Sequence, residues 1–105
     1  MGTIRDYRNM VEQPWGKMFY ELIYEQLNIS EEKRVRILDF GAGFCITANY
    51  YAKNHEVVAV EPNEEMYNLR AEDNEYTLIT QGGIILRPFL IIISMLFFVI
   101  MFWNT

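Results

Sequence analysis

The feature that most constrains the fold of this 105-residue chain is a glycine-rich turn placed directly after a short apolar strand. The strand is predicted over residues 35–40, and Gly41 and Gly43 follow Asp39 in the pattern Asp-x-Gly-x-Gly. Glycine adopts backbone angles that side chains forbid, so such a turn can present its N–H groups to a ligand. About 20 residues later, a second apolar run ends in Glu61, where an α/β fold of this kind holds a ribose.

The elements around this turn alternate between helices and strands. Apolar residues from Trp15 to Leu27 recur at helical spacing and predict an amphipathic helix over residues 14–27. The further elements predicted in chain order are strand 35–40, helix 46–53, strand 56–60, a helix capped by Asn63, and strand 76–80. The chain is therefore predicted to be α/β, an incomplete Rossmann-like fold of about three parallel strands with helices.

The turn with Asp39 and Glu61 resembles the cofactor-binding half of the class I S-adenosylmethionine-dependent methyltransferases. The likeness covers roughly residues 5–80 and implies S-adenosylmethionine as the cofactor. By this resemblance, Asp39 orients the turn near the methionine moiety, and Glu61 accepts hydrogen bonds from both ribose hydroxyls. Apolar side chains after Glu61 would border the adenine, as Pro62 and Met66 do in this sequence. The cofactor-binding residues that the resemblance implies are Asp39, Gly41, Ala42, Gly43, Glu61 and Pro62.

Two positions distinguish this turn from related glycine-rich motifs. In class I methyltransferases the pattern commonly runs D-x-G-x-G-x-G, and Cys45 replaces its last glycine. The nicotinamide fingerprint is G-x-G-x-x-G, and Ile46 stands at its third glycine. A nicotinamide-dependent oxidoreductase is therefore the less favoured alternative, and it predicts binding of a dinucleotide in preference to S-adenosylmethionine.

The two ends of the chain differ from this core. Residues 13–16, Gln-Pro-Trp-Gly, and the helix after them resemble the lid helix that precedes the core in small methyltransferases. The predicted organisation is a lid-like helical region over residues 1–30, a partial cofactor-binding core over 31–82 and an apolar tail over 83–105. The tail is expected to form an apolar C-terminal helix.

Two interpretations of the tail compete. In the first, residues 84–103 insert into a membrane, and the chain is a small membrane-anchored protein with a nucleotide-binding-like head. Residues 89–103 carry no charge, but as a helix they extend about 22 Å, which is short for a hydrocarbon layer of about 30 Å. Arg87 near the amino end of the segment would keep the head in the cytoplasm.

In the second interpretation, the tail is read in a shifted frame. In the shifted frame, each codon consists of the third base of one original codon and the first two bases of the next. Whatever synonymous codons are used, residues 101–104 then encode Val, Leu and Glu in turn. The same shift permits Phe-Asp-Val-Ile-Phe-Cys-His-Asn before them and Tyr after them. That string resembles the fourth strand of a class I methyltransferase, so we hypothesise a one-base shift between residues 80 and 87. The nucleotide sequence of that stretch decides between anchor and frame shift.

The net charge and a few single residues exclude some functions for the chain and indicate where individual side chains lie. The net charge of −5 argues against a nucleic-acid surface built on bulk positive potential. The single Cys45 and the single His55 offer neither a disulfide nor a zinc cluster. We expect Cys45 to be buried, His55 to lie in a solvated turn, and Trp15, Tyr50 and Tyr51 to pack in a core or lid. The acids expected to form a solvated helix face and loop are Glu64, Glu65, Glu72, Asp73 and Glu75.

Methyl transfer from a sulfonium depends mainly on positioning and on excluding water. The fourth strand and the substrate loops of a complete methyltransferase are not recognisable in this frame, so the edge of the first strand is expected to be open. The chain is therefore expected to be a truncated methyltransferase without catalytic residues or useful activity. Its complete relatives would act on a small molecule or a tRNA, and DNA is not expected as a partner. Family resemblance implies the cytoplasm, or a membrane if residues 84–103 insert.

Overall fold

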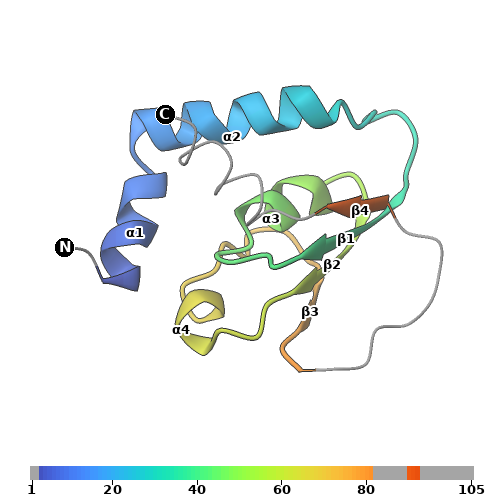
Figure 1. Ribbon diagram of the computed structural model, residues 1–105. Helices are drawn as coiled ribbons and strands as arrows, with labels where there is room; N and C mark the ends of the chain where they lie inside the picture. The colour runs from blue at the N-terminus through green and yellow to red at the C-terminus, as the bar shows by residue number, and fades with distance from the viewer. Residues whose placement is uncertain (1–2, 82–89, 93–105) are drawn as a thin grey trace. The chain divides into compact units, whose positions relative to one another are not determined.

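The computed structural model describes residues 3–81 and 90–92 (Figure 1). The chain divides into two compact units, Met1–Ser30 and Glu31–Thr105, and each is described by itself. The first unit contains two helices, and the second contains a parallel sheet with further helices. The prediction of an α/β fold with three parallel strands is confirmed.

The first unit is built from α1 (Ile4–Val11) and α2 (Pro14–Leu27). Sequence reasoning missed α1, which begins with a capping box: the Thr3 hydroxyl accepts from the N–H of Asp6, and the Asp6 carboxylate accepts from the N–H of Thr3. The predicted helix over 14–27 is confirmed with Pro14 at its first turn. It ends at Asn28, which takes the left-handed conformation with φ of 49°.

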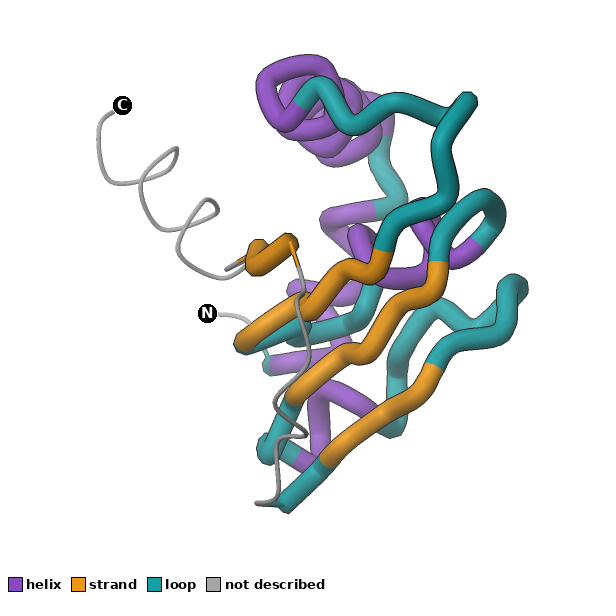
Figure 2. Tube along the Cα trace, turned by 90° about the vertical axis from the view of Figure 1, so that its right-hand side faces the viewer, coloured by secondary structure: helices purple, strands orange, loops and turns teal. Residues whose placement is uncertain are grey.

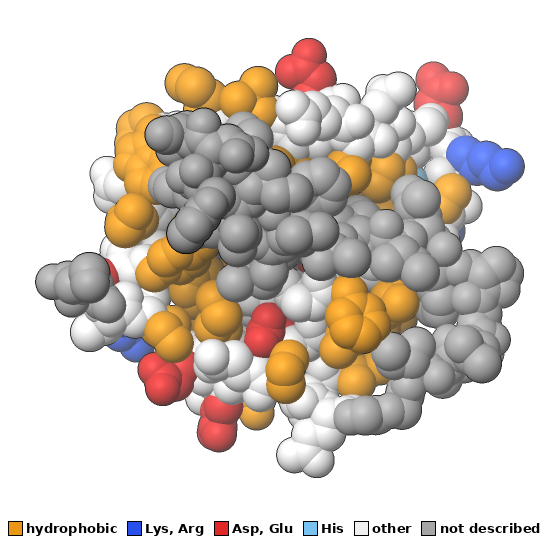
Figure 3. Space-filling view, viewed as in Figure 1, with side chains coloured by type: hydrophobic (Ala, Val, Ile, Leu, Met, Phe, Trp, Pro, Cys, Tyr) orange, Lys and Arg blue, Asp and Glu red, His pale blue; other side chains and the backbone are white. Residues whose placement is uncertain are grey.

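The apolar stripe of α2 is only half covered. Phe19 and Ile23 are buried, whereas Trp15, Met18 and Leu22 are at least two-fifths exposed. Hydrophobic side chains accordingly reach the surface on the face drawn in Figure 3. Of the two expected positions for Trp15, core or lid, its 42% exposure argues against the core and leaves the lid a prediction.

The second unit is organised by a parallel sheet with the strand order β3-β2-β1-β4. The strands are β1 (Arg36–Phe40), β2 (Glu56–Val60), β3 (Thr77–Ile79) and β4 (Leu90–Ile92). In register, Ile37 pairs with Val57 of β2 on one side and with Leu90 of β4 on the other. Figure 2 shows β1, β2 and β3 side by side.

Helix α3 (Ile46–Ala52) connects β1 to β2 and packs against both. The core between them includes the buried side chains of Ile37, Val57, Ala48 and Tyr51. The shorter α4 (Glu64–Tyr67) follows β2 and begins at Asn63, whose side chain accepts from the N–H of Met66. The predicted elements from residue 35 to residue 80 are thus all present, because apolar strands and capped helices carry clear local signals.

The fourth strand corrects two expectations about the tail. Residues Leu90–Ile92 form β4, where an apolar helix was expected, and β4 covers the edge of β1 that was expected to be open. The physical reason is that the N–H and C=O groups on a free edge of β1 pair with any extended segment, and Leu-Ile-Ile favours extended backbone. Within the described residues, no helix has the length and apolarity needed to cross a membrane. The rest of the predicted tail lies outside the described residues.

His55 also differs from its prediction. Its side chain is only 2% exposed, although a solvated turn was expected. The ring nitrogen Nδ1 accepts a hydrogen bond of 3.1 Å from the N–H of Val35, just before β1. His55 therefore joins the start of β1 to the start of β2, a contact between residues 20 positions apart that no local pattern reveals.

Candidate functional site

The predicted site residues gather where β1 and β2 end. Gly41 follows β1, Glu61 follows β2, and the two strands run parallel, so their carboxyl ends lie at the same edge of the sheet. The chain passes from β1 to β2 on one side, and β4 lies on the other side of β1. Such a reversal of strand order is the place where open α/β sheets bind ligands.

The glycine turn folds back onto the end of β2. Gly41 and Gly43 have φ angles of 67° and 61°, which a side chain would disfavour. The N–H of Ala42 donates to the carbonyl of Val60 at 3.0 Å. The N–H of Gly43 donates to Oε1 of Glu61 at 2.6 Å. Both N–H groups, which were expected to face a ligand, are therefore already engaged within the protein.

Glu61 is a buried carboxylate, with 5% of its surface exposed. Its Oε1 accepts from Gly43, and its Oε2 accepts from the N–H of Asn63 at 2.9 Å. A carboxylate has about four acceptor positions on its two oxygens, so each oxygen keeps one for a further donor. These two hydrogen bonds therefore leave one acceptor position on each oxygen unused.

An apolar cavity of about 440 Å³ lies at the carboxyl ends of three strands, and its lining includes the chain neighbours of Glu61, Val60 and Pro62. Pro62 lines it, as the resemblance implies for a residue that borders a base. Sequence reasoning did not place the other lining residues, which are Phe40, Gly41, Val60, Ile79, Thr80 and Gln81. The signal that could have found them is the common edge at which parallel strands end, because it brings the end of β3 beside the end of β2.

Asp39 lies beneath the turn and is completely buried. In the sheet it pairs with Ala59 of β2 and Ile92 of β4. The contact of Asp39 with the methionine moiety stays a prediction, and the Asp39 side chain is enclosed within the unit.

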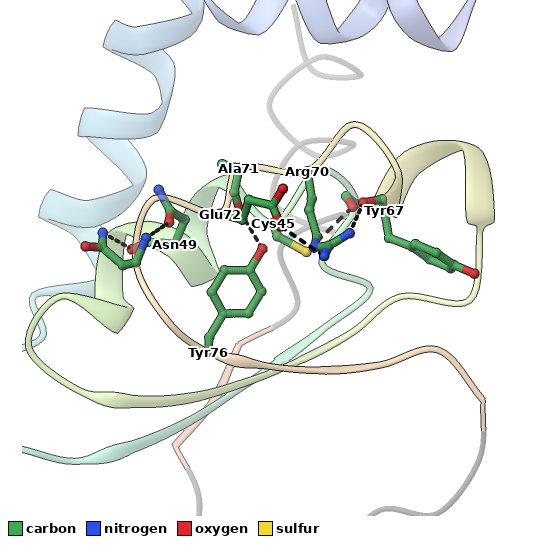
Figure 4. Close-up of polar contacts among 9 residues, drawn as sticks. Cys45, Asn49, Tyr67, Arg70, Ala71, Glu72 and Tyr76 are labelled. Carbon is green, nitrogen blue, oxygen red and sulfur yellow. Dashed lines mark hydrogen bonds and ion pairs between the residues drawn. The ribbon is translucent and has the colours of Figure 1, made fainter.

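Cys45 occupies the position of the missing last glycine and adopts a glycine-like backbone, with φ of 57°. The prediction that Cys45 is buried is confirmed, with none of its surface exposed. Its thiol donates to the carbonyl of Gly43 at 3.9 Å and lies near Tyr76 and Arg70 (Figure 4). The hydroxyl of Tyr76 in turn donates to the carbonyl of Ala71. The residue that departs from the glycine pattern thus keeps the backbone shape that the glycine would supply.

The buried Cys45 should resist alkylation in the folded protein. Burial raises the pKa of its thiol to about 11, so at pH 8 the thiolate fraction is roughly a hundredfold below that of an exposed cysteine. Iodoacetamide labelling followed by mass spectrometry is expected to be at least a hundredfold slower for native protein than for protein in denaturant. Equal labelling rates in the native and the denatured protein would contradict this prediction.

The same pKa shift makes stability depend on pH. Because the folded pKa of the Cys45 thiol lies above the unfolded value, its contribution to stability is complete below about pH 8.5 and is lost as the pH rises through 11.

The loop between α4 and β3 is attached to α3 by two asparagines. The side-chain carbonyl of Asn49 accepts from the N–H of Asn74, and the side-chain amide of Asn74 donates to the backbone carbonyl of Asn49, both at 2.8 Å (Figure 4). The exposed acids Glu72, Asp73 and Glu75 lie on this loop, as predicted. The loop is therefore held in place from α3.

Replacing Asn74 by Asp should loosen this loop. The substitution keeps the shape of the side chain but turns its donor into an oxygen that faces the Asn49 carbonyl, so we expect a loss of about 1–2 kcal/mol in unfolding free energy. Urea denaturation measures the unfolding free energy. Asn74→Ala removes the donor without adding repulsion, so its unfolding free energy should fall by less than that of Asn74→Asp. An Asp variant as stable as the wild type would show that the hydrogen bond from the Asn74 side chain contributes nothing.

Neither the family models nor the curated proteins include a match to this chain. The site is therefore interpreted from its own geometry.

Proposed function

We propose that the second unit binds S-adenosylmethionine at the carboxyl edge of its sheet, as the cofactor half of a class I methyltransferase. We also propose that the 105-residue chain transfers no methyl group by itself. The observation that carries the proposal is the buried carboxylate of Glu61, which accepts from the glycine turn at the same sheet edge as an apolar cavity lined by its chain neighbours Val60 and Pro62. A nucleoside needs this combination, since its base is flat and largely apolar and its ribose offers two adjacent hydroxyls.

The residues present fit the nucleoside part of the cofactor. The cavity lined by Val60, Pro62 and Ile79 would take the adenine, and the free acceptor positions on Glu61 would take the ribose hydroxyls. The methionine part would lie along the glycine turn, where Gly41 and Gly43 leave room for close approach. When bound, the cofactor supplies an electrophilic methyl group on its sulfonium.

The proposed lack of activity follows from what the described residues bring to this edge. They contribute the ends of β1, β2 and β3, which line the cavity proposed for the cofactor, and the three-residue strand β4 beside β1. A methyl acceptor must be held in line with the sulfonium and shielded from water. Incubation of the purified chain with S-adenosylmethionine and a tRNA or metabolite mixture is expected to yield no S-adenosylhomocysteine, and its formation above the buffer control would refute this part.

Binding is tested directly by calorimetric titration of the 105-residue chain with S-adenosylmethionine and, separately, with NAD. We expect S-adenosylmethionine to bind and NAD to bind more weakly or not at all. Thr80→Trp should abolish binding, because Thr80 lines the cavity just after β3 and an indole there would fill it. Thr77→Trp, at the exposed opposite end of the same strand, is the matched control and should bind normally.

Two outcomes would overturn the proposal. Equal heats for wild type and Thr80→Trp would exclude the cavity as the binding site. Tighter binding of NAD than of S-adenosylmethionine would favour the oxidoreductase alternative, despite Ile46 in the place of the third glycine.

A further inference from the structure

The carboxylate of Glu61 holds two separate segments of backbone at once. Oε1 accepts from Gly43 in the turn after β1 at 2.6 Å, and Oε2 accepts from Asn63 at the start of α4 at 2.9 Å. Gly43 is buried, and the Glu61 side chain is 5% exposed, so water does not readily replace either contact. Hydrogen bonds from backbone N–H groups to a buried carboxylate are among the stronger ones in proteins.

The two N–H groups of the turn are secured in different ways. Ala42 donates to the main-chain carbonyl of Val60, a partner that any residue at that position would provide. Gly43 donates to a side chain, and that side chain must reach back from the residue after β2 and end in an acceptor. The conformation of the turn at Gly43 thus depends on the identity of residue 61.

We propose that Glu61 is a positioning residue that fixes the glycine turn, and that it thereby couples recognition of the ribose to recognition of the methionine part of the ligand. The first half rests on the two hydrogen bonds alone, and the second half rests on the proposed function. The two oxygens that would accept from the ribose hydroxyls already hold the turn along which the methionine part would lie. When the turn is already ordered, less conformational entropy is lost on ligand binding. Removing the Glu61 carboxylate would therefore also weaken the contacts between the turn and the methionine part, although Glu61 does not make those contacts itself.

Amide hydrogen exchange of the full chain, followed by NMR, tests the positioning role without any ligand. In Glu61→Ala, exchange at Gly43 and Asn63 is expected to accelerate at least about tenfold, with other amides of β1 and β2 unchanged. Glu61→Gln should protect only one of the two amides, because its side chain has a single acceptor oxygen. Glu65→Ala removes an exposed acid from nearby α4 and is the matched control, with no expected change at either amide. Unchanged exchange at Gly43 in both Glu61 variants would overturn the positioning role.

The coupling is tested with L-methionine, which lacks the ribose, beside S-adenosylmethionine. If Glu61 only contacts the ribose, Glu61→Ala lowers the affinity for S-adenosylmethionine and leaves the affinity for methionine unchanged. If Glu61 also positions the turn, methionine affinity measured by chemical-shift titration falls as well, by about fivefold, and Glu61→Gln partly restores it. Unchanged methionine affinity in Glu61→Ala would overturn the coupling.

Failure of the proposed function has a separate signature. If neither ligand binds the wild-type chain, the cofactor assignment and the coupling are both wrong. The exchange rates at Gly43 and Asn63 still decide whether Glu61 fixes the turn. A variant that fails to fold is recognised by loss of exchange protection throughout the sheet. In that case Glu61→Gln, which retains one acceptor, carries the test.

Discussion

Replacing Gly16 by Ala is expected to disrupt the first helical unit. A Cβ at this position would lie 2.7 Å from both the Cα and the carbonyl oxygen of Val11 and 2.8 Å from the carbonyl oxygen of Met10. These are backbone atoms, so the clash cannot be relieved by rotating a side chain. We expect Gly16→Ala to destabilise the unit by about 3 kcal/mol, measured by amide exchange across α1 and α2.

The sign of this effect makes the test decisive. Inside an ordinary helix, glycine to alanine stabilises by roughly 0.5–1 kcal/mol because glycine loses more backbone entropy on folding. Lys17→Ala, at the exposed neighbouring position of α2, is the control and should change stability by less than about 0.5 kcal/mol. A Gly16→Ala protein with slower exchange in α1 and α2 than the wild type would contradict the close approach of α2 to the end of α1.

Replacing Ile37 by Ala is expected to have the largest effect on the second unit. Ile37 has none of its surface exposed and lies in β1, between β2 and β4. Loss of a buried isoleucine side chain to alanine costs about 2–5 kcal/mol, a large share of the 5–15 kcal/mol typical of a whole domain. Urea denaturation should show a lower midpoint with an unchanged slope.

Two companion variants separate packing from other causes. Ile37→Val removes a single methylene and should cost about 1 kcal/mol. Arg36→Ala breaks an exposed ion pair with Glu56, of 2.7 Å, and should cost less than about 1 kcal/mol. Saturating S-adenosylmethionine should raise the midpoint of Ile37→Ala if the proposed function holds. Equal midpoints for all three variants would show that Ile37 is not part of a tightly packed core.

The local part of this fold was predictable from the sequence. The bounds of α2 and β2 agree with prediction to the residue, because α2 has helical apolar spacing after Pro14, and β2 is a short β-branched run between polar residues. The N-terminal helix α1 was missed, although Ile4, Tyr7 and Val11 stand at helical spacing among its charged residues. Its capping box, Thr3 with Asp6, was nevertheless readable in the sequence.

The contacts between distant residues were not predictable in the same way. The burial of His55 depends on the N–H of Val35, and β4 depends on the edge of β1. The same holds for the candidate site: the pattern placed Gly43 and Glu61 at one edge, but it did not indicate that they bond to each other. Periodicity and turn chemistry report on neighbours in the chain, whereas these contacts are settled only when the strands align.

The position of β1 in the sheet also bears on the order in which the unit is built during synthesis. Its pairing with β2 closes a short loop that contains only α3, whereas its pairing with β4 joins residues more than twice as far apart in the chain. Closing the longer loop is slower and costs more entropy. A chain emerging from the ribosome can therefore form the β1–α3–β2 segment, and with it the bond between Gly43 and Glu61, before β4 has been made. The nascent chain would acquire the contact between Gly43 and Glu61 first and the edge strand β4 last.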